Sequence, residues 1–302
     1  KTGSWKPYLN HVGGGTPVFA GSINFGQQPF KHTPPTGFKK YNTFNLPDST
    51  IEDGSDYFTP VLYTGNNASG RNIPTGFPGG WTWIKNRNAA NSHTLSDIVR
   101  GDGKTLFTNA TNAEVDYGSN GIDLVSDGFD VTHNATNNLF NVTGRTYVSW
   151  NWKANGSGVS NTAGTITSTV SANTEAGFSI VSYTGNGTSG ATVGHGLGVA
   201  PSMVICKNRT TGTGSGAWPV WHKSLSSVTS YLFLNTTAAQ ASGNNNFTAA
   251  PTSTVLNLGT SDTNNSATMI AYCFAEVEGY SAFGSYTGNG NAEGPFVYTG
   301  FR

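Results

Sequence analysis

The phrase Tyr-Thr-Gly-Asn occurs three times in this chain, and each copy runs into a turn-forming stretch rich in Gly, Asn and Ser. The copies begin at Tyr63, Tyr183 and Tyr286. A phrase that recurs at intervals of about one small domain indicates an internal duplication. This feature limits the fold more than any other, because the duplicated segments must share one architecture.

Further matches follow the first two copies in the same order and at nearly constant spacing. They are Trp81–Arg87 with Met203–Arg209, Leu106–Glu114 with Leu232–Gln240, and Thr146–Ala154 with Thr268–Glu276. We therefore predict two tandem domains, repeat 1 at 53–157 and repeat 2 at 176–280. A Ser/Thr-rich insertion or linker is expected at 158–175, with one strand at Thr165–Val170.

The third copy of the phrase stands close to the end of the sequence. Residues 281–302 are expected either to start a third repeat or to dock as an added strand. One strand cannot bury a core of its own, so we expect the natural chain to continue past Arg302.

The matched segments have the pattern of β-strands. Tyr147–Trp152 alternates between two faces, which predicts a half-buried strand, whereas Met269–Val277 is apolar on both faces, which predicts a central strand covered on both sides. Ser92–Gly101 is the one helix candidate, from its spacing of Leu95, Ile98 and Val99. The predicted fold class is all-β, with tandem β-sandwiches of jelly-roll or concanavalin-like topology.

The charge composition argues against several classes of partner. Charged residues make up 11% of the chain, and the 16 Lys and Arg residues equal the 16 Asp and Glu residues. A nucleic-acid-binding protein needs a basic stripe, and a membrane-spanning helix needs a long apolar run, so neither partner is expected. No motif for a cofactor or a zinc ion is present, and none is expected to bind.

The first 52 residues contain the motifs Asn24–Gln27, Pro29-Phe30, Pro34–Phe38 and Asn45–Pro47. Through these motifs the segment resembles the C-terminal part of SPRY-like sandwich domains found in phage virion proteins. The resemblance implies that 1–52 is the C-terminal part of a β-sandwich whose earlier strands lie outside this sequence.

The remainder contains the motifs Trp81–Asn88, Leu95–Glu114 and Leu124–Val131 in repeat 1, and Gly177–Arg209 in repeat 2. Through these motifs it resembles a domain of unknown function that recurs in structural proteins of tailed phages. Repeat 2 departs from the Asp97-x-x-Arg100-Gly element, where it has Trp218–Ser227 instead. The resemblance implies a non-enzymatic, self-associating protein of a tail fibre or a related extracellular surface filament, on the virion surface, with a role in host attachment.

One candidate binding site is suggested by aromatic residues. Trp218, Trp221 and His222 lie close together, and an exposed Trp beside His and Lys can stack on a sugar. The alternative interpretation places one Trp in the core and one at the rim of the sandwich.

Two further groups have both a functional and a structural interpretation. Asp116, Asp123, Asp127 and Asp130 could supply oxygen ligands to Ca²⁺, but Asp also favours turns and strand ends, which is the interpretation that we favour. Cys206 and Cys273 could pair, but we favour two buried thiols that pack as small apolar side chains.

Three functional hypotheses follow. The first is a structural module of a surface filament, and the second is a lectin-like module that binds host-surface glycans. The third, a polysaccharide-degrading enzyme, ranks last, because the two repeats share no acid or nucleophile.

Overall fold

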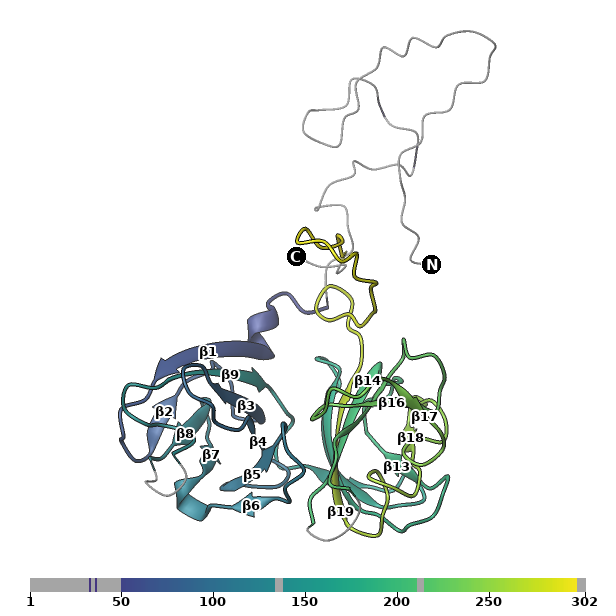
Figure 1. Ribbon diagram of the computed structural model, residues 1–302, viewed down its shortest axis with the longest axis horizontal. Coiled ribbons are helices and arrows are strands. Elements are labelled where there is room, and N and C mark those ends of the chain that lie inside the picture. The colour runs from purple at the N-terminus through teal and green to yellow at the C-terminus, as the bar shows by residue number, and fades with distance from the viewer. Residues whose placement is uncertain (1–32, 34–35, 37–49, 134–137, 211–214, 298–302) are drawn as a thin grey trace. The chain divides into compact units, whose positions relative to one another are not determined.

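A computed structural model describes residues 33, 36, 50–133, 138–210 and 215–297 (Figure 1). The chain divides into two compact units, 1–48 and 49–302, and nearly all the described residues belong to the second unit. Almost all of the segment expected to be SPRY-like, 1–52, lies outside the described residues.

The described fold is all-β, as predicted. Repeat 1 has a six-stranded sheet in the order β1-β9-β3-β4-β5-β6 and a three-stranded sheet in the order β2-β8-β7, with antiparallel pairing. The strands are β1 (Phe58–Thr64), β2 (Arg71–Ile73), β3 (Trp81–Asn86), β4 (Thr94–Asp97), β5 (Lys104–Phe107), β6 (Val115–Asp116), β7 (Ile122–Leu124), β8 (Phe129–Val131) and β9 (Thr146–Trp152).

Repeat 2 has an eight-stranded sheet in the order β10-β11-β12-β19-β14-β15-β16-β17 and a two-stranded sheet, β13-β18. The strands are β10 (Val159–Asn161), β11 (Ser168–Asn173), β12 (Phe178–Thr184), β13 (Thr192–Gly194), β14 (Met203–Asn208), β15 (Pro219–His222), β16 (Ser230–Phe233), β17 (Ala241–Ser242), β18 (Val255–Asn257) and β19 (Thr268–Phe274).

The two large sheets have the same strand order. The series β1-β9-β3-β4-β5-β6 in repeat 1 corresponds to β12-β19-β14-β15-β16-β17 in repeat 2. The topology therefore agrees with the duplication that the sequence indicates. The second sheet differs in having two extra strands, β10 and β11, on its β12 side.

Those extra strands come from the Ser/Thr-rich stretch 158–175, where an insertion or linker was expected. Strand β11 pairs with β12 along its whole length, and β10 pairs with β11. Thr and Val favour the extended backbone, and Val170 is buried in the core of repeat 2. The stretch is thus part of the second sheet.

Each repeat buries a core between its large and small sheets. In repeat 1 this core includes Tyr63, Ile73, Phe129 and Tyr147. A third core lies between the two large sheets and joins the repeats. It contains Trp81, Leu95 and Leu106 from repeat 1 and Phe178, Ile180, Ile205, Trp218, Val220, Ile270, Tyr272 and Phe274 from repeat 2.

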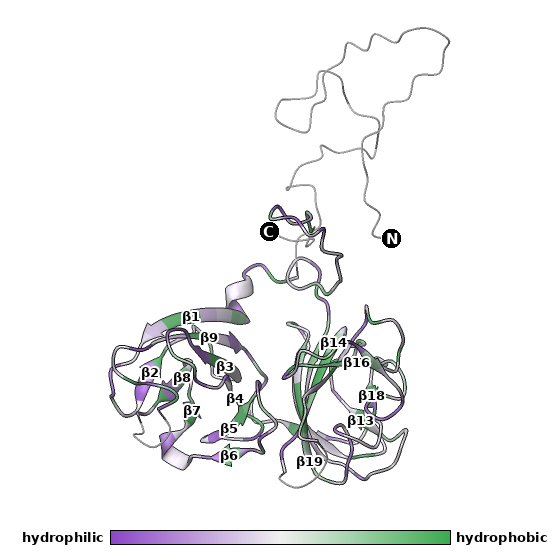
Figure 2. Cartoon of the chain, viewed as in Figure 1, coloured by the Kyte–Doolittle hydropathy of each residue, from purple (hydrophilic) through white to green (hydrophobic). Residues whose placement is uncertain are grey.

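Strand β19 shows why one sequence segment is apolar on both faces. Met269, Ala271 and Cys273 face the core within repeat 2, while Ile270 and Tyr272 face the core between the repeats. Figure 2 shows hydrophobic residues along the strands of this sheet. The prediction of a central strand covered on both sides is confirmed.

The helix expected at Ser92–Gly101 was wrong. Strand β4 occupies its centre and pairs with β3 and β5, and a turn follows in which the Arg100 N–H donates to Asp97 Oδ1 at 2.9 Å. Pairing with two neighbours outweighs the helical spacing of a short apolar run. In the described residues, helix is limited to short 3₁₀ segments at Gly54–Asp56 and Gly118–Asn120. No described helix is long and apolar enough to cross a membrane.

The Tyr-Thr-Gly-Asn phrase ends the opening strand of each sandwich. Its Asn forms hydrogen bonds with a second, buried Asn, and this polar cage is the same in both repeats. Asn66 N–H donates to Asn141 Oδ1 at 3.1 Å, and Asn186 N–H donates to Asn264 Oδ1 at 2.7 Å. A Cβ added at Gly65 would lie 2.1 Å from a backbone oxygen, so the Gly is required by close approach.

The turn after the phrase uses a left-handed residue in each copy. Asn67 has φ 60°, Gly187 has φ 69° and Gly290 has φ 69°. The third copy thus forms the same local turn, with Asn291 N–H donating to Asn289 Oδ1. Residues 282–297 form no strand in the part of the chain that the structure describes.

Candidate ligand-binding site

The two tryptophans expected to stack on a sugar are not on the surface. Trp218 is 0% exposed and Trp221 is 5% exposed. The Trp218 indole N–H points to the carbonyls of Phe107 and Ala110 at 3.0 and 3.1 Å, and the Trp221 indole N–H donates to the Val228 carbonyl at 3.0 Å. Neither indole is available to stack on a sugar.

His222, the third expected residue, is half-buried and also has a structural role. Its Nδ1 accepts a hydrogen bond from the Ser224 N–H at 3.1 Å, and its ring lies 6.2 Å from that of Phe283. Trp218, directly before β15, and Val220 lie in the core between the repeats, whereas Trp221 lies in the core of repeat 2. The three residues therefore do not share one surface.

The aspartates of repeat 1 hold turns and neighbouring strands. Asp127 Oδ1 accepts from the N–H groups of Thr75 and Gly76, and Asp116 Oδ1 accepts from Gly118 N–H. Asp130 Oδ1 accepts from the Asn72 amide. In the part of the chain that the structure describes, no three His, Cys, Asp or Glu side chains gather in a way that could hold a metal ion.

Cys206 and Cys273 are free thiols and are buried on the neighbouring strands β14 and β19, in agreement with the favoured interpretation. Burial raises the pKa of Cys273 to about 12 and raises that of Cys206 as well. Both thiols therefore stay protonated at neutral pH and pack as small apolar groups.

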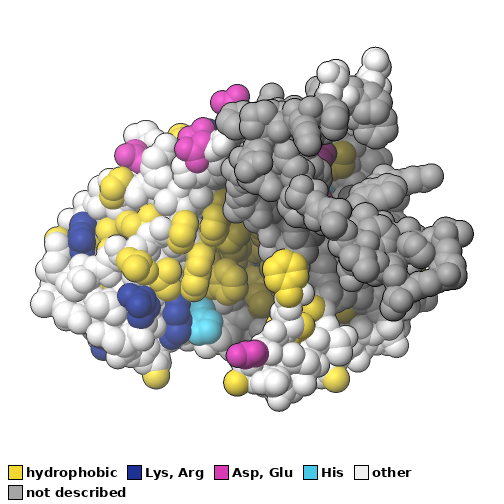
Figure 3. Space-filling view, turned by 90° about the horizontal axis from the view of Figure 1, so that it is seen from above, with side chains coloured by type: hydrophobic (Ala, Val, Ile, Leu, Met, Phe, Trp, Pro, Cys, Tyr) yellow, Lys and Arg dark blue, Asp and Glu magenta, His cyan; other side chains and the backbone are white. Residues whose placement is uncertain are grey.

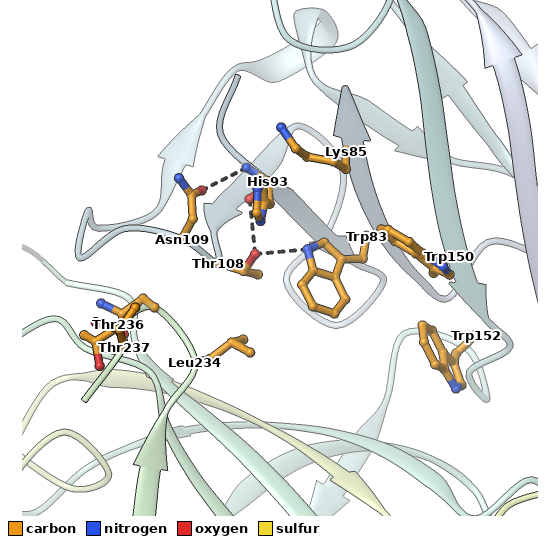
Figure 4. A pocket seen from close by; sticks show the side chains of 11 residues that line it. Trp83, Lys85, His93, Thr108, Asn109, Trp150, Trp152, Leu234, Thr236 and Thr237 are labelled. Atoms are coloured by element: carbon orange, nitrogen blue, oxygen red, sulfur yellow. Dashed lines mark hydrogen bonds between the residues drawn. The ribbon is translucent and has the colours of Figure 1, made fainter. Parts of the chain in front are cut away.

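A groove between the repeats, with a volume of about 950 Å³, is a better candidate site. Its lining residues come from both repeats: Trp83, Lys85, His93, Thr108, Asn109, Trp150, Trp152, Leu234, Asn235, Thr236 and Thr237. Figure 4 shows the tryptophans on β3 and β9 along one wall, and Leu234, Thr236 and Thr237 on the loop that follows β16 across from them.

The aromatic wall is preorganised. Trp83 and Trp150 are cross-strand partners in the β3–β9 ladder, with ring centroids 5.7 Å apart and an interplanar angle of 55°. The Trp83 indole N–H donates to Thr108 Oγ1 at 3.0 Å, which fixes the ring. Both indoles are half-buried and so keep part of their apolar surface for a ligand.

Polar groups border this wall. Lys85 Nζ donates to the Asn91 carbonyl at 3.0 Å, and the backbone N–H of His93 donates to Asn109 Oδ1 at 2.9 Å. Burial and the charge of Lys85 lower the pKa of His93, so its imidazole is neutral at pH 7. No carboxylate is among the residues that line the groove.

A space-filling view shows apolar and basic side chains together on one face of the molecule. In Figure 3 apolar side chains gather in a broad patch, and Lys or Arg side chains and a His border it. A concave apolar surface with a few polar groups at its margin is the usual form of a small-molecule site.

A buried charge network fixes the repeats on either side of the groove. Arg100 is paired with Asp97 at 2.5 Å and with Glu114 at 3.0 Å, and Glu114 is paired with Arg209 of repeat 2 at 2.8 Å. The Tyr272 hydroxyl donates to Asp97 Oδ2 at 2.7 Å. The Asp-x-x-Arg-Gly element of repeat 1 is thus part of the contact between the repeats.

The sequence carried a signal for the groove. The pattern of Tyr147–Trp152 places Val148, Trp150 and Trp152 on the less buried face, and that face supplies the wall. The sequence did not indicate that Leu234–Thr237 would line the groove, because their position there depends on the packing of one repeat on the other.

Comparison with known proteins assigns a family. Residues 53–302 match the family described as "Domain of unknown function (DUF7483)". A search of curated proteins and a search of solved structures each gave no match. Because the family match spans both repeats and most of the chain, this protein belongs to the DUF7483 family.

Proposed function

We propose that this protein is a carbohydrate-binding module, which binds a saccharide in the groove between its repeats. The observation that carries the proposal is the preorganised aromatic wall of Trp83, Trp150 and Trp152, bordered by Lys85 and His93. The proposed role is binding and not catalysis.

The chemistry of this groove suits a sugar. A pyranose ring has an apolar face of C–H groups, which packs on an indole, and a rim of hydroxyls, which need hydrogen-bond partners. Asn109, Asn235, Thr236 and Thr237 supply amide and hydroxyl groups around the wall. Binding an apolar face while pairing the hydroxyls is what a mixed lining of this kind achieves.

The test is a glycan array followed by calorimetry on the glycans that bind. Trp150→Ala should weaken binding at least tenfold, or about 1.4 kcal/mol, because it removes one of the three indoles of the aromatic wall. Leu62→Ala is the matched control, because Leu62 lies on β1 of the same sheet, is 65% exposed and does not line the groove. Silence on the array, or equal affinities for wild type and Trp150→Ala, would refute the proposal.

A second candidate is a structural module of a surface filament, such as a phage tail fibre. The observation that favours it is the joining of the two repeats by a shared apolar core and by the Arg100–Glu114–Arg209 network, which gives a stiff building block. Sedimentation of the full chain tests it: self-association supports a filament component, and a monodisperse monomer at high concentration argues against one.

A further inference from the structure

The groove has a counterpart in repeat 2, and comparing the two copies indicates what the groove binds. Lys85 on β3 corresponds to Lys207 on β14. Lys85 is the cross-strand partner of Val148 on β9, and Lys207 is the partner of Ile270 on β19. Lys85 Nζ donates to the Asn91 carbonyl at 3.0 Å, and Lys207 Nζ donates to the Gly216 carbonyl at 2.6 Å.

The neighbouring positions correspond in the same way. The backbone N–H of His93 donates to Asn109 Oδ1 at 2.9 Å, and the backbone N–H of Trp218 donates to Asn235 Oδ1 at 3.0 Å. Trp218 therefore occupies the place in repeat 2 that His93 occupies in repeat 1.

In repeat 2 this place is filled by protein. The indole of Trp218 fills it, and the end of β5 together with the loop that follows it in repeat 1 covers it with backbone carbonyls. Phe107 and Ala110 face the indole N–H, and the Thr111 carbonyl accepts a hydrogen bond from Lys207 Nζ at 3.3 Å. Among the described residues, the ammonium of Lys207 thus has two carbonyl acceptors.

In repeat 1 the corresponding place is open. The loop after β16, Leu234–Thr237, lines the groove but leaves it hollow. Among the described residues Asn91 is the one hydrogen-bond acceptor of Lys85 Nζ. An ammonium has three N–H donors, so two remain for a ligand or for water.

The charges around Lys207 and Lys85 indicate which kind of acceptor suits Lys85. Neutral carbonyls satisfy Lys207 only in part: burial lowers its pKa to about 8, and the charge of Asp262 offsets this only partly. Burial disfavours an ammonium, and an opposite charge beside the ammonium counters that effect. The groove has no Asp or Glu in its lining, and Lys85 borders an aromatic wall that excludes water once a ligand is bound.

We infer that the groove binds an acidic saccharide, with the carboxylate of a uronic acid residue on Lys85, in the position that the Thr111 carbonyl takes at Lys207. This inference rests on the proposed function and adds the class of sugar. The pyranose face packs on Trp150, and the carboxylate supplies both the missing acceptor and the missing charge.

The test compares acidic oligosaccharides with their carboxyl-reduced neutral counterparts at low salt. The probes are oligomers of galacturonate, of mannuronate and of hyaluronan. At least one acid should bind tenfold or more tightly than its reduced form, and that preference should weaken with added salt.

Variants of lysine assign the preference. Lys85→Met should abolish the preference for the acid and leave the affinity for the reduced form within about twofold. Lys104→Met is the control for loss of a positive charge outside the groove. Equal affinities for acid and reduced forms, a preference that persists in Lys85→Met, or no binding of any of the three acids would overturn the inference. Binding of neutral saccharides that depends on Trp150, with no preference for any of the three acids over its reduced form, would overturn this inference alone and leave the proposed function standing.

Discussion

The carboxylate of Glu114 in repeat 1 accepts two hydrogen bonds from the guanidinium of Arg209 in repeat 2, at 2.8 and 2.9 Å. Arg100 donates to the same carboxylate at 3.0 Å, and its side chain is 0% exposed. A single carboxylate thus neutralises one cation from each repeat. The pair of Glu114 and Arg209 therefore connects the two sandwiches.

Replacing that carboxylate tests how strongly it couples the repeats. Glu114→Gln should lower the free energy of unfolding by about 2–3 kcal/mol, because Arg209 loses its charged partner while Arg100 keeps only Asp97. The side chains of Glu114 and Arg209 are 14% and 13% exposed, which keeps the loss below that of a fully buried pair. Urea unfolding measures it, and the exposed Glu52→Gln should change little. A loss equal to that of Glu52→Gln would contradict the coupling role.

The same carboxylate predicts a pH dependence. Burial alone would raise the pKa of Glu114, but the hydrogen bonds and charges of Arg209 and Arg100 outweigh it, and the net shift is downward. A carboxyl with a lowered pKa in the folded state stabilises the fold above its unfolded pKa, near 4.3, and loses this contribution as the pH falls through its folded value. The stability difference between wild type and Glu114→Gln should therefore shrink on acidification. A difference that stays constant from pH 7 to pH 3 would count against this assignment.

Lys207 should titrate far below an ordinary lysine. Burial lowers its pKa to about 8, and the charge of Asp262 opposes this only partly. Because the folded pKa is below the unfolded one, this residue destabilises the fold at low pH, and the effect fades as the pH rises through about 8. NMR of the lysine side chains should show one resonance with a midpoint near pH 8, which Lys207→Arg removes. A midpoint above pH 10 would disprove the shift.

The repeated cage around the Tyr-Thr-Gly-Asn phrase should contribute equally in both repeats. Asn141 is 0% exposed, and its amide donates to Asn66 Oδ1 and the Ala68 carbonyl. Asn264 is also 0% exposed, and its amide donates to Asn186 Oδ1 and to the Thr188 carbonyl. Asn141→Ala and Asn264→Ala should each cost about 2–4 kcal/mol, because each leaves several buried groups unpaired.

Calorimetric unfolding measures both losses. The exposed Asn112→Ala serves as the control and should change the stability by less than about 0.5 kcal/mol. If only one of the two cage variants were destabilised, the cages would not be equivalent.

The comparison of the two copies predicts a way to close the groove. His93→Trp places in repeat 1 the residue that fills the corresponding place in repeat 2, so it should abolish saccharide binding with little loss of stability. Glycan binding and thermal unfolding report the two effects. A His93→Trp protein that folds and binds as tightly as wild type would show that the ligand lies elsewhere.

Much of the fold was predictable, because the residue pattern within each strand indicates that strand without reference to distant residues. The alternation of Tyr147–Trp152 and the two apolar faces of Met269–Val277 identified a half-buried and a central strand. The helix expected at Ser92–Gly101 failed, because its apolar spacing also suits a strand followed by a turn, and sheet partners decided between them.

The site was less predictable than the strands that carry it. Trp218 and Trp221 have the composition of a sugar platform, but the packing of one large sheet on the other buries Trp218. The same packing creates the groove at Trp83 and Trp150. Which face of a sheet is covered depends on residues more than 100 positions away, such as Phe107 and Trp218, whose contact spans 111 positions.

The face-to-face packing of the two large sheets has a consequence for how such a protein can acquire specificity. A duplicated domain that packs against its own copy presents each contact twice, once in each direction. A substitution in one repeat only, such as His in place of Trp, opens one of these contacts. The corresponding contact continues to hold the two repeats together. Recognition and cohesion can then diverge independently, although both began as the same surface.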